Sequence, residues 1–303
     1  MAGPIGTWSF PKAAIPGVNK WFGIGYDQPN EEFKSLFDMY PSKRLYEEDV
    51  ATSGFGLLNA KVEGRPGTYL SQSQLWTARY TNVPYELKFR VTFEHSLTNQ
   101  YVELANKRAR LLGNARRQTI ETIAANVYNR VTNGDYLGGD GVVLGSASHP
   151  SAAGNWSNIL TPARDIAEKA IEDLITQILN CQDDNGQEIN LKPLSIHIPP
   201  DLWFETLRIL ESELQNWTAN NAVNALRISG QFPKGIKLND YFTDADAWFI
   251  RTSCPDGMKG FVLHEYDIKN EYDFETDDER FKTYWNGCFG WSDPRGLFMS
   301  VGI

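Results

Sequence analysis

Carboxylate side chains crowd the stretch 271–279, and they are the first residues in the chain whose types could do chemistry. The cluster consists of Glu271, Asp273, Glu275, Asp277, Asp278 and Glu279. Two carboxyls at a fixed separation act as acid and base in glycoside hydrolysis, and several together bind cations. Acidic residues are most often solvated surface, and no spacing here singles out an acid and a base. We therefore expect no catalytic pair. A carbohydrate-active enzyme stays open as an alternative of another class, because aromatic residues make up 13% of the chain.

The other residue types that build active sites are scattered. None of the histidines has the short two-histidine spacing of zinc enzymes; they are His95, His149, His197 and His264. Gly23-Ile24-Gly25 lacks the third glycine of a dinucleotide site, and the chain has neither a Walker sequence nor a Gly-x-Ser-x-Gly elbow. If Gly186 takes the sixth position of a calcium loop, the first position falls on Cys181. The sequence thus predicts no enzyme, no cofactor and no metal site.

Composition limits the function further. A chain of 303 residues, 41% hydrophobic and 22% charged, is typical of one large soluble domain or two moderate ones. Its net charge of -9 argues against a dedicated nucleic-acid binder. Cys181, Cys254 and Cys288 lie far apart and favour a reducing compartment over a disulfide framework. The stretch 1–12 lacks the apolar segment of a signal peptide, and no apolar run reaches the length of a membrane span.

The element that must position the rest is a long helix expected over 96–132. Apolar residues recur there at helical spacing, and the outer faces are basic. Ser96 or Thr98 could cap its start, and Asn133-Gly134 supplies a stop. Gly113 lies in its middle, so we expect a bend or break there. This helix would be a spine against which other parts, or other subunits, lie.

Two extensions are expected before the spine. Residues 1–29 alternate glycine and proline with aromatic residues, which predicts an arm without regular structure that needs a surface to cover it. A short helix should follow over 33–40 and end at Pro41. Residues 50–93 show period-two alternation around a turn at 63–67, which predicts a long β-hairpin. Since the hairpin is poor in aliphatic residues, we expect contact with a partner to order it.

The rest of the chain alternates helices and strands. Thr161-Pro162 should open a helix, Leu194–Ile198 should form a strand, and Asp201 should open another helix. Residues 213–240 are asparagine-rich and are expected to be irregular. The strands expected afterwards are 248–250, 261–268, 280–285 and 297–301. This order of elements predicts an α+β class.

Several short motifs resemble one known family in their order along the chain. After the spine these are Asp140-Gly141 to Leu144, His149-Pro150, Ser157-Asn158, Asp183 with Gly186, and Leu194 to Ile198 followed by Pro199-Pro200-Asp201-Leu202. Later come Asn220, Asn221 and Asn224, then Ala247-Trp248-Phe249, and Trp291 with Asp293, Arg295 and Gly296. Over residues 30–303 the chain resembles the major capsid protein of tailed bacteriophages, the Hong Kong 97 fold, and within it the Mu-like major head subunits.

The resemblance implies a division of the chain. Residues 1–49 would be the N-terminal arm with its short helix, and 50–93 the extended loop that lies over a neighbouring subunit. Residues 94–159 would form the peripheral domain with its spine helix, 160–250 the axial domain that meets its copies at the capsomer centre, and 251–303 the remaining peripheral strands. These spans follow from the family and not from the residue patterns alone.

The resemblance also implies a function and partners. The chain would self-assemble into hexamers and pentamers of an icosahedral shell around double-stranded phage DNA, without sequence-specific contact to that DNA. It would be assembled in the host cytoplasm and end in the virion. No helical pro-segment precedes the arm in this sequence, so a separate scaffolding protein is implied if scaffolding is used, with a portal and possibly a decoration protein. An encapsulin-like cellular compartment is the alternative with the same fold.

Candidate intersubunit contacts are charged residues on the expected extensions and spine. They are Lys61, Glu63, Arg65, Arg79, Arg108 and Arg116. Arg65 lies between Gly64 and Pro66, and would pair with Glu47, Glu48, Asp49 or the 271–279 cluster of a neighbour. Some relatives crosslink a lysine of this loop to a neighbour's asparagine. Lys61 has a comparable place, although we expect no crosslink.

Overall fold

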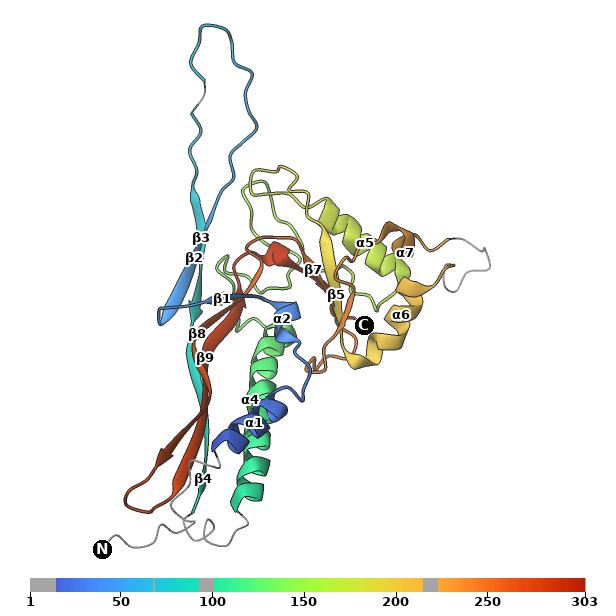
Figure 1. The fold of residues 1–303 in the computed structure, drawn as a ribbon. Coiled ribbons are helices and arrows are strands. Elements are labelled where there is room, and N and C mark those ends of the chain that lie inside the picture. Colours follow the sequence, from blue (N-terminus) through green and yellow to red (C-terminus); the bar gives the residue numbers. More distant parts are fainter. Residues whose placement is uncertain (1–14, 68, 93–100, 215–222, 303) are drawn as a thin grey trace, which may run out of the picture.

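The computed structural model describes residues 15–67, 69–92, 101–214 and 223–302, and Figure 1 shows the arrangement of its elements. The helices are α1 (Ile15–Tyr26), α2 (Phe33–Leu36), α4 (Tyr101–Asn129), α5 (Glu168–Leu179), α6 (Trp203–Glu211) and α7 (Ala225–Ser229), with short 3-10 turns η3 (Pro200–Leu202) and η4 (Pro294–Gly296). The strands are β1 (Asp38–Pro41), β2 (Tyr46–Thr52), β3 (Gln74–Thr81), β4 (Val83–Val91), β5 (Pro193–Ile198), β6 (Ile236–Leu238), β7 (Trp248–Thr252), β8 (Met258–Tyr272), β9 (Glu279–Trp291) and β10 (Leu297–Ser300).

A four-stranded sheet in the order β1-β8-β9-β4 lies against the long helix α4. Strands β8 and β9 form a long antiparallel pair, β4 is antiparallel to β9, and β1 is parallel to β8. The apolar face of α4 meets this sheet along its length: Ala105, Ala109 and Leu112 pack with Phe281 near one end. Farther along, Ile120 belongs to the same buried cluster as Trp285 of β9. The spine is therefore held by its sheet, as its apolar stripe predicts.

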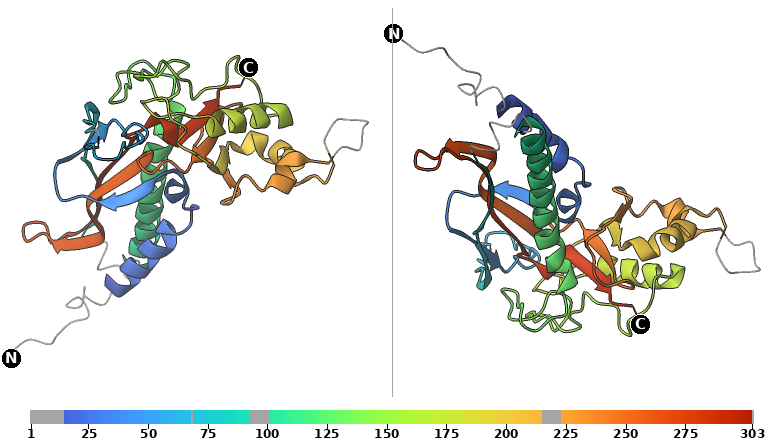
Figure 2. Two further views of the ribbon diagram at one scale, coloured as in Figure 1. Left: turned by 90° about the horizontal axis from the view of Figure 1, so that it is seen from above. Right: turned by 90° about the horizontal axis from the view of Figure 1, so that it is seen from below.

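The described helix α4 is continuous through Gly113, so the expected break is absent from it. The reason is a helix crossing that the sequence did not reveal. A β-carbon on Gly113 would lie 2.2 Å from the Phe22 carbonyl oxygen, and one on Gly25 would lie 1.9 Å from the Arg110 carbonyl oxygen. Glycine on both helices thus permits α1 to lie directly on α4 (Figure 2).

The same contact corrects the prediction that 1–29 lacks regular structure. Residues 15–26 form α1, and Val18 and Phe22 are buried with Ala105, Ala109 and Leu112 of the spine. Packing against α4 stabilises a helix whose glycines are poor helix formers in isolation. The proposed spine caps Ser96 and Thr98, and residues 1–14 of the arm, lie outside the described residues.

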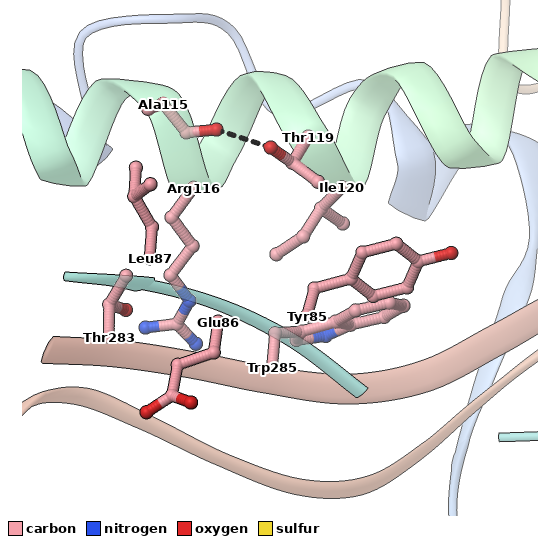
Figure 3. Close-up of a pocket in the computed structure, with 9 residues that line it drawn as sticks. All are labelled: Tyr85, Glu86, Leu87, Ala115, Arg116, Thr119, Ile120, Thr283 and Trp285. Carbon is pink, nitrogen blue, oxygen red and sulfur yellow. Dashed lines mark hydrogen bonds between the residues drawn. The ribbon is translucent and has the colours of Figure 1, made fainter. Parts of the chain in front are cut away.

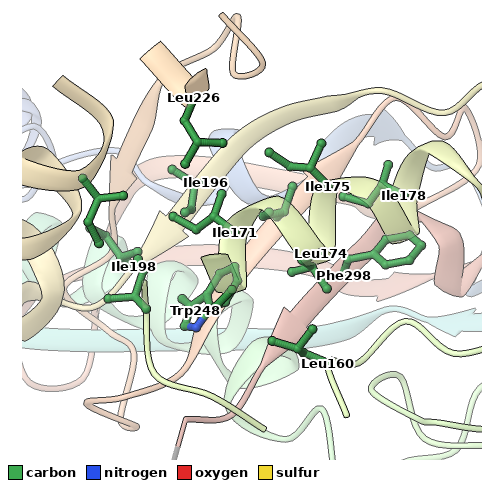
Figure 4. Packing of buried hydrophobic residues seen from close by; sticks show 14 of the residues in the cluster. Leu160, Ile171, Leu174, Ile175, Ile178, Ile196, Ile198, Leu226, Trp248 and Phe298 are labelled. Carbon is green, nitrogen blue, oxygen red and sulfur yellow. The ribbon is translucent and has the colours of Figure 1, made fainter. Parts of the chain in front are cut away.

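A second four-stranded sheet has the order β10-β7-β5-β6 and is covered by α5 and α6. Figure 4 shows its core, in which Ile171, Leu174 and Ile178 of α5 pack with Trp248 and Phe298. Burial of this α5 face was expected. The start of the helix was wrong, because α5 begins at Glu168 and not at Thr161.

The segment before α5 is held by hydrogen bonds to the second sheet and does not form a helix. Arg164 donates its backbone N–H to Ser300 Oγ at 3.0 Å, and its carbonyl accepts from Ser300 Oγ at 2.7 Å and from Trp248 Nε1 at 3.2 Å. These bonds tie the chain to the sheet edge and compete with the hydrogen bonds of a helix.

The hairpin pairs over a different range from the one expected. Strands β2 and β3 pair from Tyr46↔Thr81 to Thr52↔Gln74, whereas β4, expected to be part of the hairpin, pairs with β9. Beyond Thr52 and before Gln74 the described residues form no strand, and this loop projects away from the rest of the molecule (Figure 1). The alternation over 83–91 is therefore that of a sheet strand.

Two smaller predictions also need correction. Helix α2 ends at Leu36, and Tyr40 and Pro41 belong to β1, where pairing with β8 replaces the helix expected to reach Pro41. The range 213–240 was expected to be irregular, yet it contains α7 and β6. Strand β10 pairs with β7 in the second sheet and so lies apart from β8 and β9. Strands β1 and β6 form because they pair with strands distant in the sequence, β8 and β5.

Candidate intersubunit surfaces

The root of the projecting hairpin is anchored firmly to the first sheet. Asp49 of β2 accepts hydrogen bonds from Lys259 Nζ at 2.6 Å and from Ser292 Oγ at 2.6 Å. Trp76 of β3 donates from Nε1 to the Ser292 carbonyl at 3.0 Å, and the Tyr80 hydroxyl is 2.6 Å from Ser292 Oγ. Two strands fixed at their base in this way hold the loop beyond them away from the molecule.

That loop exposes apolar side chains that its own chain leaves uncovered. They are Phe55, Leu57, Leu58, Val62, Tyr69 and Leu70, of which Leu58 is 99% and Tyr69 98% exposed. Near its base the loop contacts the 183–187 turn, where Asn185 Nδ2 donates to the Gly54 carbonyl at 2.7 Å and Gln187 Nε2 to the Phe55 carbonyl at 3.2 Å. A concentration of exposed apolar side chains marks a surface that another molecule covers.

The charged residues of the tip are free in the described structure. Lys61, Glu63 and Arg65 are exposed, and within the described residues none of the three forms an ion pair. The counter-charges suggested for Arg65 are partly committed within the chain: Asp49 binds Lys259, and Glu48 lies 3.9 Å from Arg79.

The remaining candidate contacts divide into exposed and buried residues. The Arg79 guanidinium is exposed beside Glu48 and lies 4.0 Å from the centre of the Tyr46 ring. Arg108 is also exposed and donates to the Arg90 carbonyl at 2.9 Å. The side chain of Arg116, in contrast, is only 4% exposed.

The contacts of Arg116 explain its burial. Its guanidinium donates to Asp267 Oδ1 at 2.7 Å and to Glu265 Oε2 at 2.7 Å, and lies 5.0 Å from the centre of the Tyr26 ring. Arg116 thus joins the spine to β8 and α1, and its charge is paired within the chain.

A shallow hollow opens beside Arg116, between the spine and strands β4 and β9 (Figure 3). It holds about 220 Å³, and its walls include Leu87, Ile120 and Trp285. Strand β4 forms one edge of its sheet, and its Leu87 side chain is half exposed. An edge strand beside an apolar hollow is a surface suited to an extended segment of another chain.

A third surface lies at the far end of the second sheet, on α6 and α7. Phe204 is 70% and Ile228 73% exposed there. A hollow of about 360 Å³ between the two helices includes Leu207, Leu226 and Phe232 in its walls. Helices α6 and α7 themselves lie at one end of the molecule, away from the spine and from the projecting hairpin (Figures 1 and 2).

The acidic cluster 271–279 surrounds the turn between β8 and β9. Asp273 pairs with Arg280, and Asp277 accepts a hydrogen bond from Tyr272. Burial raises the pKa of Glu279 above its ordinary value. Asp273 and Asp277 are therefore bound to neighbouring side chains of their own turn.

One buried group has the geometry of a nucleophile, a base and an orienting residue. Ser195 Oγ lies 3.0 Å from His197 Nε2, and His197 Nδ1 lies 3.1 Å from Asn239 Oδ1. All three residues are at most 1% exposed, so a substrate has no access to them. Burial lowers the pKa of His197 to about 3, which keeps the ring neutral. Ser195 and His197 are two positions apart on β5, so their side chains share a face of the strand. No sequence pattern connects either residue with Asn239.

Two other properties concern the described residues alone. They contain no group of three or more histidine, cysteine or acidic side chains arranged to hold a metal ion. None of the helices they form has the length and apolar character that a membrane crossing requires.

Together these features define a class of protein. A spine helix on one sheet, a second α/β body and a hairpin projecting beyond both make the α+β fold of Hong Kong 97-type capsid subunits. The chain belongs to the phage capsid protein family, whose model matches residues 77–300. It is a structural capsid protein and not an enzyme. No curated protein matches it in sequence.

Solved structures show the same fold. The virus-like particle from Pyrococcus furiosus aligns with a TM-score of 0.55 and 13% identity over 94% of this chain and 98% of that one. Mycobacterium phage Che8 aligns with a TM-score of 0.52 and 14% identity, covering 90% and 94%. The capsid of Myoviridae phage XM1 also has a TM-score of 0.52, with 12% identity over 89% and 90%. At such low identity the likeness concerns the fold alone.

Proposed function

We propose that this capsid protein assembles into hexamers and pentamers that close into an icosahedral shell around double-stranded DNA. The observation that carries the proposal is the loop between Thr52 and Gln74, whose apolar side chains its own chain leaves exposed. In a shell of identical subunits, every loop has a neighbouring copy to cover it. Burial of this apolar area would stabilise the shell by roughly 25 cal/mol per Å².

In this proposal the two bodies have separate tasks. The sheet β1-β8-β9-β4 with the spine is the peripheral domain, and the sheet β10-β7-β5-β6 with α5 to α7 is the axial domain. The exposed Phe204 and Ile228 would then meet their copies around the centre of each capsomer. Lys61, Glu63, Arg65, Arg79 and Arg108 are the intersubunit contacts we retain. We leave out Arg116 because its charge is paired within the chain.

The proposal includes partners outside the shell itself. The net charge of -9 suits a protein that encloses DNA without binding it in a sequence-specific manner. A scaffolding protein, a portal and possibly a decoration protein would act during assembly in the host cytoplasm, and the virion is the end product. These assignments rest on the family of the chain.

The hairpin offers a direct test of the proposal. Replacing residues 53–73 by Asn-Gly joins the paired ends Thr52 and Gln74 with a two-residue turn and leaves both bodies intact. We expect the shortened chain to stay folded by circular dichroism and monomeric by light scattering, while the full chain forms shells. Shells of ordinary size from the shortened chain would contradict the proposal.

An encapsulin-like compartment is the second candidate, because the Pyrococcus furiosus structure with the same fold is a virus-like particle. The two candidates differ in contents. Shells purified from the native source should contain double-stranded DNA if the main proposal holds, whereas an enzyme cargo without DNA would favour the compartment.

A further inference from the structure

Two glutamates are buried where three parts of the chain meet. Glu121 lies on the spine helix and is 1% exposed, and Glu32, directly before α2, is 8% exposed. Glu121 accepts backbone hydrogen bonds from Glu32 at 3.1 Å and from Phe33 at 2.8 Å, so each of its oxygens holds the start of α2. Glu32 Oε2 accepts from the Asp240 N–H at 3.0 Å and from Asn239 Nδ2 at 3.4 Å, both just after β6. The carboxyls therefore connect the spine, α2 and the second sheet.

A neutral histidine, His197, fixes the orientation of the Asn239 side chain. Because His197 is buried and uncharged, its Nδ1–H donates to Asn239 Oδ1 and its Nε2 accepts from Ser195 Oγ. With its oxygen occupied in this way, Asn239 directs its amide donor toward Glu32. The buried group that resembles a catalytic triad thus serves to position a donor for the carboxyl.

The charges around this junction are unbalanced. Arg117 is the described cation beside it, 4.0 Å from Glu121, but its guanidinium also lies 2.9 Å from Glu31 and 3.9 Å from Asp27. The loop after β6 adds the acidic residue Asp240 to this junction. It also adds Tyr241, whose pKa burial raises above its ordinary value, so this residue brings no positive charge. If Glu32 and Glu121 were both ionised, the buried site would hold more negative charge than Arg117 neutralises.

Burial acts on both carboxyls in the same direction. It raises the pKa of Glu32, and likewise of Glu121, from an ordinary 4.5 to about 7. Both oxygens of Glu121 accept backbone N–H groups and Oε1 lies 4.0 Å from Arg117, and these contacts oppose the effect of burial on its pKa. Glu32 Oε1 accepts no hydrogen bond within the described residues, so it is the atom with room for a proton.

We propose that Glu32 and Glu121 form a proton-dependent joint, which fastens α2 and the loop after β6 to the spine while Glu32 holds a proton and loosens them when that proton is lost. The direction follows from linkage. A carboxyl protonated more readily in the folded state than in the unfolded state binds extra protons on folding between pH 4.5 and about 7. Its contribution to stability is fully present below pH 4.5 and falls as the pH rises to about 7. Neutral pH is thus where the two bodies become able to shift against each other.

The test uses Glu32→Gln in the full-length chain, since glutamine keeps the acceptor oxygen and replaces the protonated one by an uncharged NH2. We expect the melting temperature of the wild type to fall relative to that of Glu32→Gln between pH 5 and pH 8, with the two equal at the acidic end. Glu205→Gln, at an exposed position on α6, should follow the wild type at every pH. Parallel curves for the wild type and Glu32→Gln would overturn the proposal.

Hydrogen exchange shows whether the pH effect is localised at the junction of α2, the spine and the loop after β6. After correction for intrinsic rates, the Phe33 and Asp240 amides of the wild type should lose about tenfold or more of their protection between pH 6 and pH 8. The same amides in Glu32→Gln should not. Should Glu32→Gln fail to fold, the infrared band of a protonated carboxyl in the wild type decides instead. Loss of that band near neutral pH supports the joint, and its absence at pH 6 overturns it.

Discussion

Gly113 of the spine lies so close to Phe22 of α1 that a β-carbon at position 113 would be 2.2 Å from the Phe22 carbonyl oxygen. The neighbouring atom is backbone and cannot rotate away, so α1 and α4 would have to separate. Glycine costs a helix about 1 kcal/mol relative to alanine, and here it permits a crossing that buries Val18 and Phe22. The first helix is thereby fixed to the element around which the subunit is built.

Gly113→Ala should therefore destabilise the subunit by about 1–3 kcal/mol in urea unfolding, despite the better helix propensity of alanine. Gly23→Ala is the matched control, because a β-carbon on this α1 residue meets nothing within 4 Å. It should leave stability unchanged or raise it by up to about 1 kcal/mol. Equal effects of the two substitutions would mean that the close crossing has no energetic weight.

Loss of the Asp49 carboxylate should loosen the hairpin root. In Asp49→Asn the charge that binds Lys259 is removed, and we expect about 1–3 kcal/mol lower stability. Amide exchange in β2 and β3 should accelerate, whereas α5, which shares no contact with Asp49, should exchange as before. A uniform change across both regions would show that the bond does not act locally.

Arg65 and Arg116 should respond differently to the loss of their positive charge. Arg65→Glu is expected to lower the melting temperature of the assembled shell and leave the isolated subunit unchanged, because Arg65 is exposed and forms no ion pair within the described residues. An exposed pair contributes only about 0–1 kcal/mol, but each subunit repeats it. Arg116→Gln should instead destabilise the isolated subunit, since it leaves Glu265 and Asp267 without their shared cation. Identical responses of the two variants would contradict this division.

Assembly should change hydrogen exchange in the loop 53–73 more than elsewhere. In an unassembled subunit these amides are expected to exchange fast, because the described loop forms no strand pairs, and in the shell a neighbour would protect them. Helix α5 should be equally protected in both states. Equal exchange of the loop before and after assembly would show that no neighbour covers it.

The sequence predicted elements well where one local pattern decides them. The apolar stripe of the spine, the strand Leu194–Ile198 and the late strands 261–268 and 280–285 were all found in the structure. The spine and the strand 280–285 have a period that reports which side is buried, whereas Leu194–Ile198 is buried on both faces.

Prediction failed where a distant contact overrides the local pattern. From the local sequence alone, Gly113 predicted a break in the spine. In the structure it permits α1 to cross α4 closely. Thr161-Pro162 has the chemistry of a helix start, yet Ser300 holds the adjoining segment to the sheet. The alternation over 83–91 was assigned to the hairpin because its true partner, β9, lies near the other end of the chain. The Glu32–Asn239 contact joins residues 207 positions apart, and no spacing rule could find it.

Electron microscopy of the purified full-length chain tests the central claim most directly. The account predicts closed shells, built from hexamers with pentamers at the vertices, in which each projecting hairpin lies on an adjacent subunit. The chain in which Asn-Gly replaces residues 53–73 should form no such shells. A stable monomer at every concentration, with no shells under any assembly condition, would contradict the account.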